Sequence, residues 1–126
     1  MLVEENAAFR QALAYLLECH LEVALVEEAS TVAEARAKAR AIALERPGVI
    51  DVVVSERSLP DGDATNFLVA LREAEADVPV LVLTFRGDRP SHERALGLGA
   101  VRVMSKDAPV EEIFDAIREL DGLEDD

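Results

Sequence analysis

The chain has 126 residues, of which 50% are hydrophobic, and its 26 acidic and 13 basic residues give a net charge of −13. This length suits one domain with a single well-packed core. The acidic balance argues against nucleic acids and anionic membranes as partners, because both attract Lys and Arg. No apolar run reaches the roughly 20 residues of a membrane span, and no basic flank followed by an apolar segment marks a signal peptide. The sequence therefore predicts a cytoplasmic protein whose partners are proteins or cations.

A short apolar stub opens the chain and leads into a helix. Leu2 and Val3 run directly into a pair of carboxylates, so a strand here would have only about three residues, fewer than is usual. Asn6 can cap the helix that follows, in which apolar residues recur at helical spacing from Phe9 to about Cys19. Because Cys19 is the only cysteine, no internal disulfide can form, and it is best explained as a small core or surface residue.

Residues 22–26 are a candidate for a short strand, and an Ala-rich helix follows them. Thr31 and Glu34 have the spacing of a capping box at the start of this helix. Its basic side chains are expected on a solvated face. Pro47 and Gly48 then end the helix.

The stretch 49–64 organises the rest of the chain. An apolar, β-branched run over residues 49–55 stops at Glu56, and a Leu-Pro-Asp-Gly turn at 59–62 opens a helix around residues 67–71. This order is typical of a buried parallel strand with an acidic side chain at its C-terminal end. Open α/β sheets carry their sites at such ends. Taken alone, Glu56 is equally well explained as a solvated loop residue.

The last third of the chain predicts two more strands and two more helices. Residues 80–84 form an unbroken apolar strand that ends in a hydroxyl, and residues 88–98 form a weaker helix. Residues 100–104 form a short strand that ends at Ser105-Lys106. The clearest helical stripe of the chain follows, with Pro109 in its first turn.

Five strands that alternate with five helices predict a three-layer α/β/α fold with a doubly wound, five-stranded parallel sheet. The C-terminal ends of such strands meet at one edge, so the polar residues Glu4, Glu5, Glu56, Thr84 and Lys106 should converge there. The three carboxylates should lie within a few ångströms of one another. Carboxylates bind Mg²⁺, and hydroxyl and ammonium groups neutralise phosphate oxygens, so the set suggests a site for Mg²⁺ and a phosphoryl group.

At these residues the sequence resembles the receiver domain of bacterial two-component response regulators. The matching segments cover essentially the whole chain, in order and spacing: 4–6, 56–63, Thr84, 99–100 and 106–109. The Lys-Asp-Ala-Pro segment is similar to receivers that precede LuxR-type DNA-binding domains. The resemblance implies a CheY-like, flavodoxin-like strand order 2-1-3-4-5. It also implies a receiver domain over residues 1–121, followed by an acidic tail over 122–126.

The resemblance also implies roles for individual residues. Glu56 stands at the position of the phosphoacceptor Asp, and Thr84 and Val103 stand at the switch positions. The residues that would hold Mg²⁺, weakly, are Glu4, Glu5, Glu56 and Ser58. The residues of the phosphate pocket are Thr84, Phe85 and Lys106.

Three departures from the family pattern argue against switching by phosphate. Glu56 replaces Asp, and its extra methylene moves the carboxylate by roughly 1 Å, which can cost on the order of a hundredfold in rate. Phe85 replaces a small residue at the pocket mouth, and Val103 replaces an aromatic residue that reports the switch. Glu5 also stands where the family usually has Asp.

We therefore expect an atypical receiver that is not an enzyme and acts as a phosphorylation-independent protein-interaction module. In it, Glu56 would pair with Lys106 and supply part of the negative charge that phosphorylation brings. The alternative for that contact is an ion pair with no signalling meaning. One alternative for the domain is a phosphorylatable receiver that takes a phosphoryl group from a histidine kinase with Mg²⁺. Another is a Mg²⁺- or Ca²⁺-binding fold outside any phosphorelay.

A protein partner or a second copy is expected on the face of the fourth helix, fifth strand and fifth helix, which the family uses for contacts. There the cations Arg102, Lys106 and Arg118 interrupt an acidic neighbourhood. Glu111 and Asp115 lie outside the apolar stripe of the last helix and should be free for contact. No nucleic acid or membrane is expected as a partner of this domain.

Overall fold

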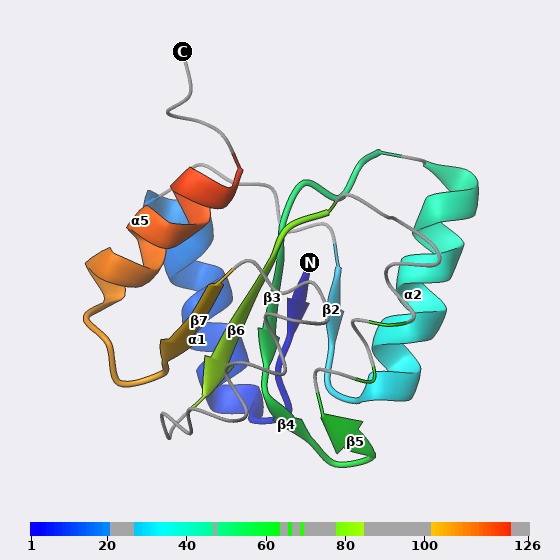
Figure 1. The fold of residues 1–126 in the computed structure, drawn as a ribbon, viewed down its shortest axis with the longest axis horizontal. Helices are drawn as coiled ribbons and strands as arrows, with labels where there is room; N and C mark the ends of the chain where they lie inside the picture. The colour runs from blue at the N-terminus through cyan, green and yellow to red at the C-terminus, as the bar shows by residue number, and fades with distance from the viewer. Residues whose placement is uncertain are drawn as a thin grey trace.

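The structure is a computed structural model, and it describes residues 1–20, 27–46, 48–63, 66, 69, 78–84 and 102–121. Five strands form one parallel sheet in the order β2 (Glu28–Ala29), β1 (Leu2–Val3), β3 (Val53–Glu56), β6 (Val80–Thr84) and β7 (Arg102–Ser105). Helix α2 (Val32–Glu45) covers one face of the sheet, and α1 (Ala7–His20) and α5 (Val110–Leu120) cover the other (Figure 1). The predicted doubly wound sheet and its strand order 2-1-3-4-5 are therefore confirmed.

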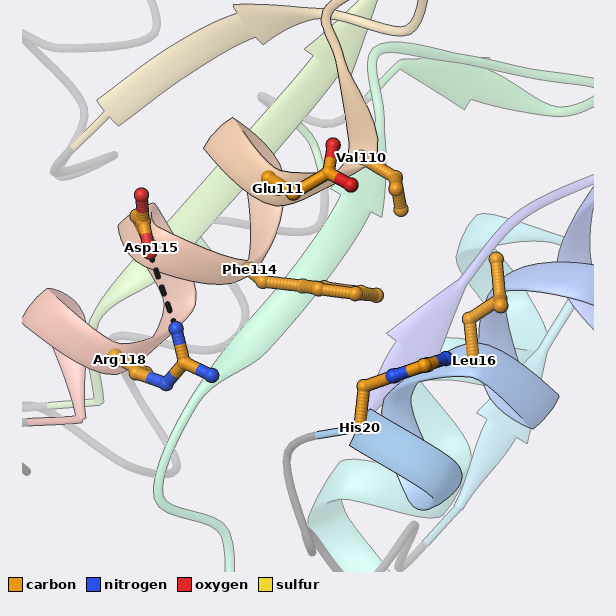
Figure 2. A pocket seen from close by; sticks show the side chains of 7 residues that line it. All are labelled: Leu16, His20, Val110, Glu111, Phe114, Asp115 and Arg118. Atoms are coloured by element: carbon orange, nitrogen blue, oxygen red, sulfur yellow. Dashed lines mark hydrogen bonds and ion pairs between the residues drawn. The ribbon is translucent and has the colours of Figure 1, made fainter.

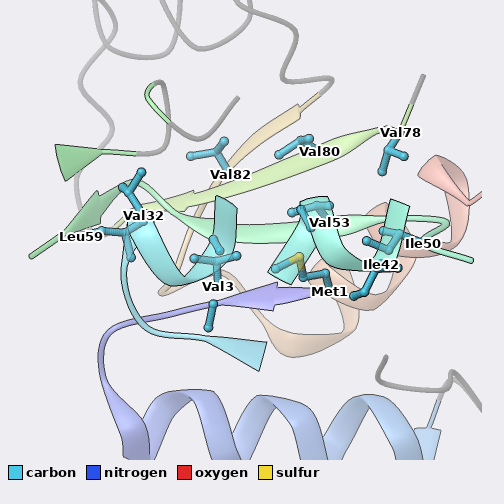
Figure 3. Packing of buried hydrophobic residues seen from close by; sticks show 13 residues of the cluster. Met1, Val3, Val32, Ile42, Ile50, Val53, Leu59, Val78, Val80 and Val82 are labelled. Atoms are coloured by element: carbon cyan, nitrogen blue, oxygen red, sulfur yellow. The ribbon is translucent and has the colours of Figure 1, made fainter. Parts of the chain in front are cut away.

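The sheet separates two hydrophobic cores because alternate residues of a strand point to opposite faces. Val3, Val53, Val80 and Val82 belong to the core on the side of α2 (Figure 3). Leu2, Val54, Leu81 and Leu83 belong to the core beneath α1 and α5. All five residues of β6 are buried, as an unbroken apolar run predicts for a strand that is covered on both faces.

Strand β3 begins later than the apolar run from residue 49 predicts. The ladder explains the difference, because β1 has only two residues and these pair with Val54 and Ser55. On the other side, the first paired residue of β6 is Val80, opposite Val53. Residues 49–52 therefore lie before the first residue of β3 that pairs with either neighbouring strand. Glu56, predicted just beyond the strand, is its last residue.

The predicted N-terminal caps of α1 and α2 are both present. Asn6 Oδ1 accepts a hydrogen bond from the Phe9 N–H at 2.9 Å. Thr31 Oγ1 accepts one from the Glu34 N–H at 3.0 Å. The Glu34 carboxylate accepts from the Ser30 N–H at 2.6 Å, one residue before the position that a capping box would use.

A small antiparallel hairpin replaces the simple turn that the Leu-Pro-Asp-Gly motif predicts. Its strands are β4 (Ser58–Leu59) and β5 (Gly62–Asp63). The Asp61 carboxylate at the tip of the hairpin accepts hydrogen bonds from the Val32 N–H at 2.7 Å and the Ala33 N–H at 3.0 Å. Helix α2 thus has a second cap, which comes from the segment that directly follows β3.

The predicted last strand and last helix differ from the structure only at their ends. Strand β7 ends at Ser105, and Pro109 is the N-cap of α5 rather than part of its first turn. Of the predicted third helix, Asn66 and Val69 are described, and both are helical. No helix within the described ranges has the length and apolar character needed to cross a membrane. The predictions that lie outside the described residues are the strand at 22–26, Phe85, the helix at 88–98 and the tail at 122–126.

Candidate functional site

Four of the predicted site residues lie at the C-terminal ends of neighbouring strands. Glu4 directly follows β1, and its N–H donates to the Ala29 carbonyl oxygen at 2.9 Å. Glu56 ends β3 and Thr84 ends β6. Lys106 follows β7, and its N–H donates to the Thr84 carbonyl oxygen at 2.8 Å. The parallel ladder therefore brings them to one edge of the sheet, as predicted.

The Lys106 ammonium group lies between the two carboxylates at this edge. Its Nζ is 2.8 Å from Glu4 Oε1 and 3.1 Å from Glu56 Oε1. The exposed fractions of the side chains are only 1% for Lys106, 2% for Glu4 and 14% for Glu56. The face of the Phe9 ring adds a third contact, with its centroid 4.4 Å from Nζ. The charged group is thus enclosed by protein atoms.

Burial raises the pKa of Glu4 to about 6. The neighbouring Glu56 carboxyl group adds to the rise of this pKa, first because a hydrogen bond between the two carboxyl groups favours the protonated form, and then because like charges disfavour ionisation. Lys106 and the Asn6 N–H, which donates to Glu4 Oε2 at 3.0 Å, act in the opposite direction. The net rise of this pKa indicates that one ammonium group does not fully offset two adjacent, buried carboxylates.

The structure also describes three other predicted site residues, Glu5, Ser58 and Val103. Glu5 is exposed, and its backbone N–H donates to Glu56 Oε2 at 3.3 Å. Ser58 is also exposed, in β4. Val103 is half-buried against the core on the α2 side. The predicted proximity therefore holds for the carboxylates of Glu4 and Glu56, and for the main chain of Glu5.

The predicted Mg²⁺ ligands do not fit a divalent metal ion in this arrangement. Mg²⁺ needs near-octahedral oxygen ligands at about 2.0–2.1 Å and usually keeps several waters. Here the carboxylates of Glu4 and Glu56 both contact the Lys106 ammonium group, which occupies the space between them. Within the described part of the chain, no three or more His, Cys, Asp or Glu side chains are grouped to hold a metal ion.

Two neighbours of the site were not predicted from the sequence. In the sequence Phe9 looks like an ordinary member of the apolar stripe of α1, so the contact between its ring and Lys106 could not be predicted. The Arg10 side chain donates to the Glu4 carbonyl oxygen at 2.7 Å and pairs with Glu28 at 3.2 Å. It thus joins the ends of β1 and β2. An Arg six residues after the first carboxylate is a weak signal, because it also suits an exposed helix position.

A groove of about 290 Å³ lies between α1 and α5 (Figure 2). Two of the side chains that line it, His20 and Phe114, stack with ring centroids 5.8 Å apart. On the α5 side, Arg118 pairs with Asp115 at 3.0 Å. The full lining is Leu16, His20, Val110, Glu111, Phe114, Asp115 and Arg118. None of the strand-end residues lines it, so the groove is separate from the site.

The surface of β7 and α5 differs from the prediction in one respect. Lys106 is buried and does not contribute a surface cation, because it points into the site between Glu4 and Glu56. Arg102 is partly exposed, and it pairs with Glu119 at 2.6 Å. The two arginines of this surface, Arg102 and Arg118, are therefore each paired with an acidic residue of α5.

Comparisons with known proteins agree with the geometry. Residues 1–118 match the family described as response regulator receiver domain. The chain is 32% identical over 119 residues to the C4-dicarboxylate transport transcriptional regulatory protein DctD of Pseudomonas aeruginosa, covering 94% of this chain and 24% of that protein. It is 26% identical to the response regulator UvrY of Escherichia coli, covering 94% of this chain and 51% of that protein. The chain thus spans about a quarter to a half of the length of these relatives.

Among solved structures, the beryllofluoride-activated NtrC4 receiver domain dimer is similar to this chain with a TM-score of 0.81 and 26% sequence identity. The similarity covers 94% of this chain and 92% of that one. A similarity of this extent shows that the two chains share the same fold.

Proposed function

Since this chain belongs to the response regulator receiver domain family, we propose that it is an atypical receiver, which acts in two-component signal transduction without being phosphorylated. The observation that carries the proposal is the contact of 3.1 Å between Lys106 Nζ and Glu56 Oε1, the carboxylate at the phosphoacceptor position. In this role the domain works as a protein-interaction module with one nearly fixed state. We also place it in the cytoplasm, which is typical of response regulators.

Both oxygens of Glu56 are engaged without phosphate, which supports the proposal. Oε1 contacts Lys106, and Oε2 accepts the Glu5 N–H at 3.3 Å. A phosphoryl group on Glu56 would have to replace these contacts. The carboxylate brings a charge of about −1, whereas a phosphoryl group brings about −1.5 to −2 and a third oxygen. The mimicry of phosphorylation is therefore partial.

Mg²⁺ has at most a weak role in this proposal. Receiver domains commonly bind Mg²⁺. In this chain a divalent ion would compete with the Lys106 ammonium for the carboxylates of Glu4 and Glu56. Such competition lowers the affinity for the ion, because the intramolecular cation is always present.

The proposed docking surface is the face of the fourth helix, β7 and α5, of which β7 and α5 are described. The NtrC4 receiver, which is a dimer in its activated form, is an example of self-association in the family. Glu111 and Asp115 are exposed on α5. With a net charge of −13, the chain should favour a partner whose contact patch is basic or apolar.

The proposal is tested by the intact mass of the protein after incubation with acetyl phosphate and Mg²⁺. The wild type should gain no phosphoryl mass, because its acceptor carboxylate is displaced and already paired. Glu56→Asp should become labelled, and Glu56→Asp combined with Phe85→Ala should become labelled further. A gain of one phosphoryl mass by the wild type, lost in Glu56→Ala, would overturn the proposal.

That outcome would support the second candidate, a receiver that takes a phosphoryl group from a histidine kinase. The observation in its favour is that Thr84 and Lys106, the hydroxyl and the lysine of the predicted phosphate pocket, follow each other along the sheet edge. Under this reading Glu56 itself would form the acyl phosphate. The same mass measurement with a cognate kinase as donor then gives the rate of transfer.

A further inference from the structure

We propose that Glu4, Glu56 and Phe9 form a cage for an organic ammonium group, with Lys106 as its tethered occupant, and that Phe9 makes this cage reject divalent metal ions. The cage and the proposed function share the contact between Lys106 and Glu56, and the cage rests on that contact. The cage adds a class of ligand, an organic ammonium group, and Phe9 is the residue that determines this class.

Three groups from different elements surround Lys106 Nζ. The carboxylate after β1 lies at 2.8 Å, the carboxylate at the end of β3 at 3.1 Å, and the centroid of the Phe9 ring on α1 at 4.4 Å. A cation within about 6 Å of an aromatic face is attracted by the ring, and more strongly when little water is present. With the Lys106 side chain only 1% exposed, this condition is met.

The ring distinguishes an ammonium group from Mg²⁺. A divalent ion would need oxygen ligands on all sides, partly from water, at about 2.0–2.1 Å. On the side of Phe9 the cage offers carbon atoms and no lone pair, and the ring fills space that waters of hydration would need. An organic ammonium group loses less favourable solvation than Mg²⁺ does, because its N–H groups contact the two carboxylates and the ring attracts its remaining charge.

Phe9 and Glu4 are held in this arrangement by the turn that joins β1 to α1. The Phe9 N–H donates to Asn6 Oδ1 at 2.9 Å, and Arg10 donates to the Glu4 carbonyl oxygen at 2.7 Å. The Phe9 side chain also packs against the core beneath α1 and α5. The ring is therefore fixed beside the carboxylate and acts as a positioning group.

The first experiment removes the occupant. Lys106→Ala leaves a space into which n-butylammonium, a mimic of the lysine side chain, should bind. At matched ionic strength n-butylammonium chloride should raise the melting temperature of this variant more than MgCl₂ does, and it should leave the wild type unchanged. In Lys106→Ala combined with Phe9→Leu, the preference for the ammonium compound should be lost. A larger rise with MgCl₂ than with n-butylammonium in Lys106→Ala would overturn the cage.

The second experiment keeps the chain intact, so it does not depend on the folding of Lys106→Ala. The chain has two lysines, Lys38 and Lys106, and Lys38, with a side chain that is 36% exposed, is the internal reference. During reductive methylation followed by peptide mass analysis, Lys106 should react at least roughly tenfold more slowly than Lys38, since its amine must first leave the cage. Millimolar Mg²⁺ should not change this ratio.

Phe9→Leu should speed up the modification of Lys106 while Lys38 reacts as before. The cage is overturned if Mg²⁺ accelerates the reaction of Lys106 in the wild type, or if Phe9→Leu leaves its rate unchanged. These outcomes are independent of labelling by acetyl phosphate. Failure of the cage can therefore be distinguished from failure of the proposed function.

Discussion

The ion pairs at the sheet edge and the ion pair between Arg118 and Asp115 on α5 each join a basic side chain to a carboxylate, but they differ in their access to water. Lys106, Glu4 and Glu56 are nearly enclosed, whereas the Arg118 and Asp115 side chains are 36% and 64% exposed. Removing one partner of a buried pair typically costs about 3–5 kcal/mol, because a charge is left uncompensated. An exposed pair is worth only about 0–1 kcal/mol. The sheet edge should therefore be sensitive to the loss of Lys106, and the α5 surface can change its charges with little effect on stability.

The largest effect is expected for Lys106→Met, which leaves two adjacent carboxylates without their cation. The free energy of unfolding should fall by about 3–5 kcal/mol, measured by urea denaturation at neutral pH. Arg118→Met is the matched control on α5 and should lose less than about 1 kcal/mol. Equal losses in the two variants would remove the distinction between the buried and the exposed ion pairs.

A smaller, pH-dependent effect is expected for Glu4→Gln. Because the pKa of Glu4 is raised from 4.5 to about 6 in the folded state, its stabilising contribution is complete below about pH 4.5 and is lost as the pH rises through about 6. Gln resembles the protonated acid at every pH. The wild type should thus match the variant near pH 4.5 and be less stable than it at pH 7 by roughly 2 kcal/mol.

Urea denaturation of both proteins at several pH values between 4.5 and 7 measures this difference. A difference that stays constant across this range would show that Glu4 does not bind its proton more tightly after folding. It would also mean that Lys106 alone neutralises both carboxylates.

A third effect, smaller again, is expected at Asp61. The N–H groups of Ala33 and Val32 lower the pKa of this carboxyl group, so its contribution to stability is present above pH 3.8 and is lost as the pH falls through the lower pKa of the folded state. Asp61→Asn should lower the melting temperature at pH 7, and the loss should shrink in acid. Asp107→Asn, at an exposed position after β7, is the control and should leave the melting temperature unchanged.

The smallest effect on stability is expected for an exchange of charges on α5. Asp115→Arg combined with Arg118→Asp keeps the ion pair but reverses its direction, so the melting temperature should stay nearly constant. If this face carries the interaction, sedimentation and partner pull-down should show weaker association. Charge reversal at Arg36 or Arg40 on α2 should have no such effect. The opposite pattern would place the functional surface on α2.

The sequence predicts the strand β6 well because its signals are local, whereas β2 (Glu28–Ala29) lies beyond the predicted strand at residues 22–26. Residues 80–84 are apolar on both faces of the strand and are flanked by turn residues, and β6 has the predicted bounds. Asn6 and Thr31 cap the helices that they were expected to cap. The convergence of Glu4, Glu56 and Lys106 follows from the parallel topology alone.

Other features depend on contacts that no local pattern encodes. The start of β3 is set by the two residues of β1 and by Val80, and these are distant in sequence. Hydrophobic periodicity identifies Phe9 only as one more apolar residue of α1 and does not reveal its contact with Lys106. Lys106 was expected both in the pocket and on the surface, and only the packing around its side chain decides between the two.

The hairpin of β4 and β5 makes two amide protons on α2 into reporters of events at the sheet edge. Asp61 holds the N–H groups of Val32 and Ala33, and the hairpin begins only two residues after Glu56. Hydrogen exchange at these amides requires that their hydrogen bonds to the Asp61 carboxylate break. A partner or a chemical change that moves the end of β3 should therefore alter their exchange rates, even though both amides belong to another element. In an NMR spectrum, the signals of these two amides would report changes at the sheet edge without a label placed in the site itself.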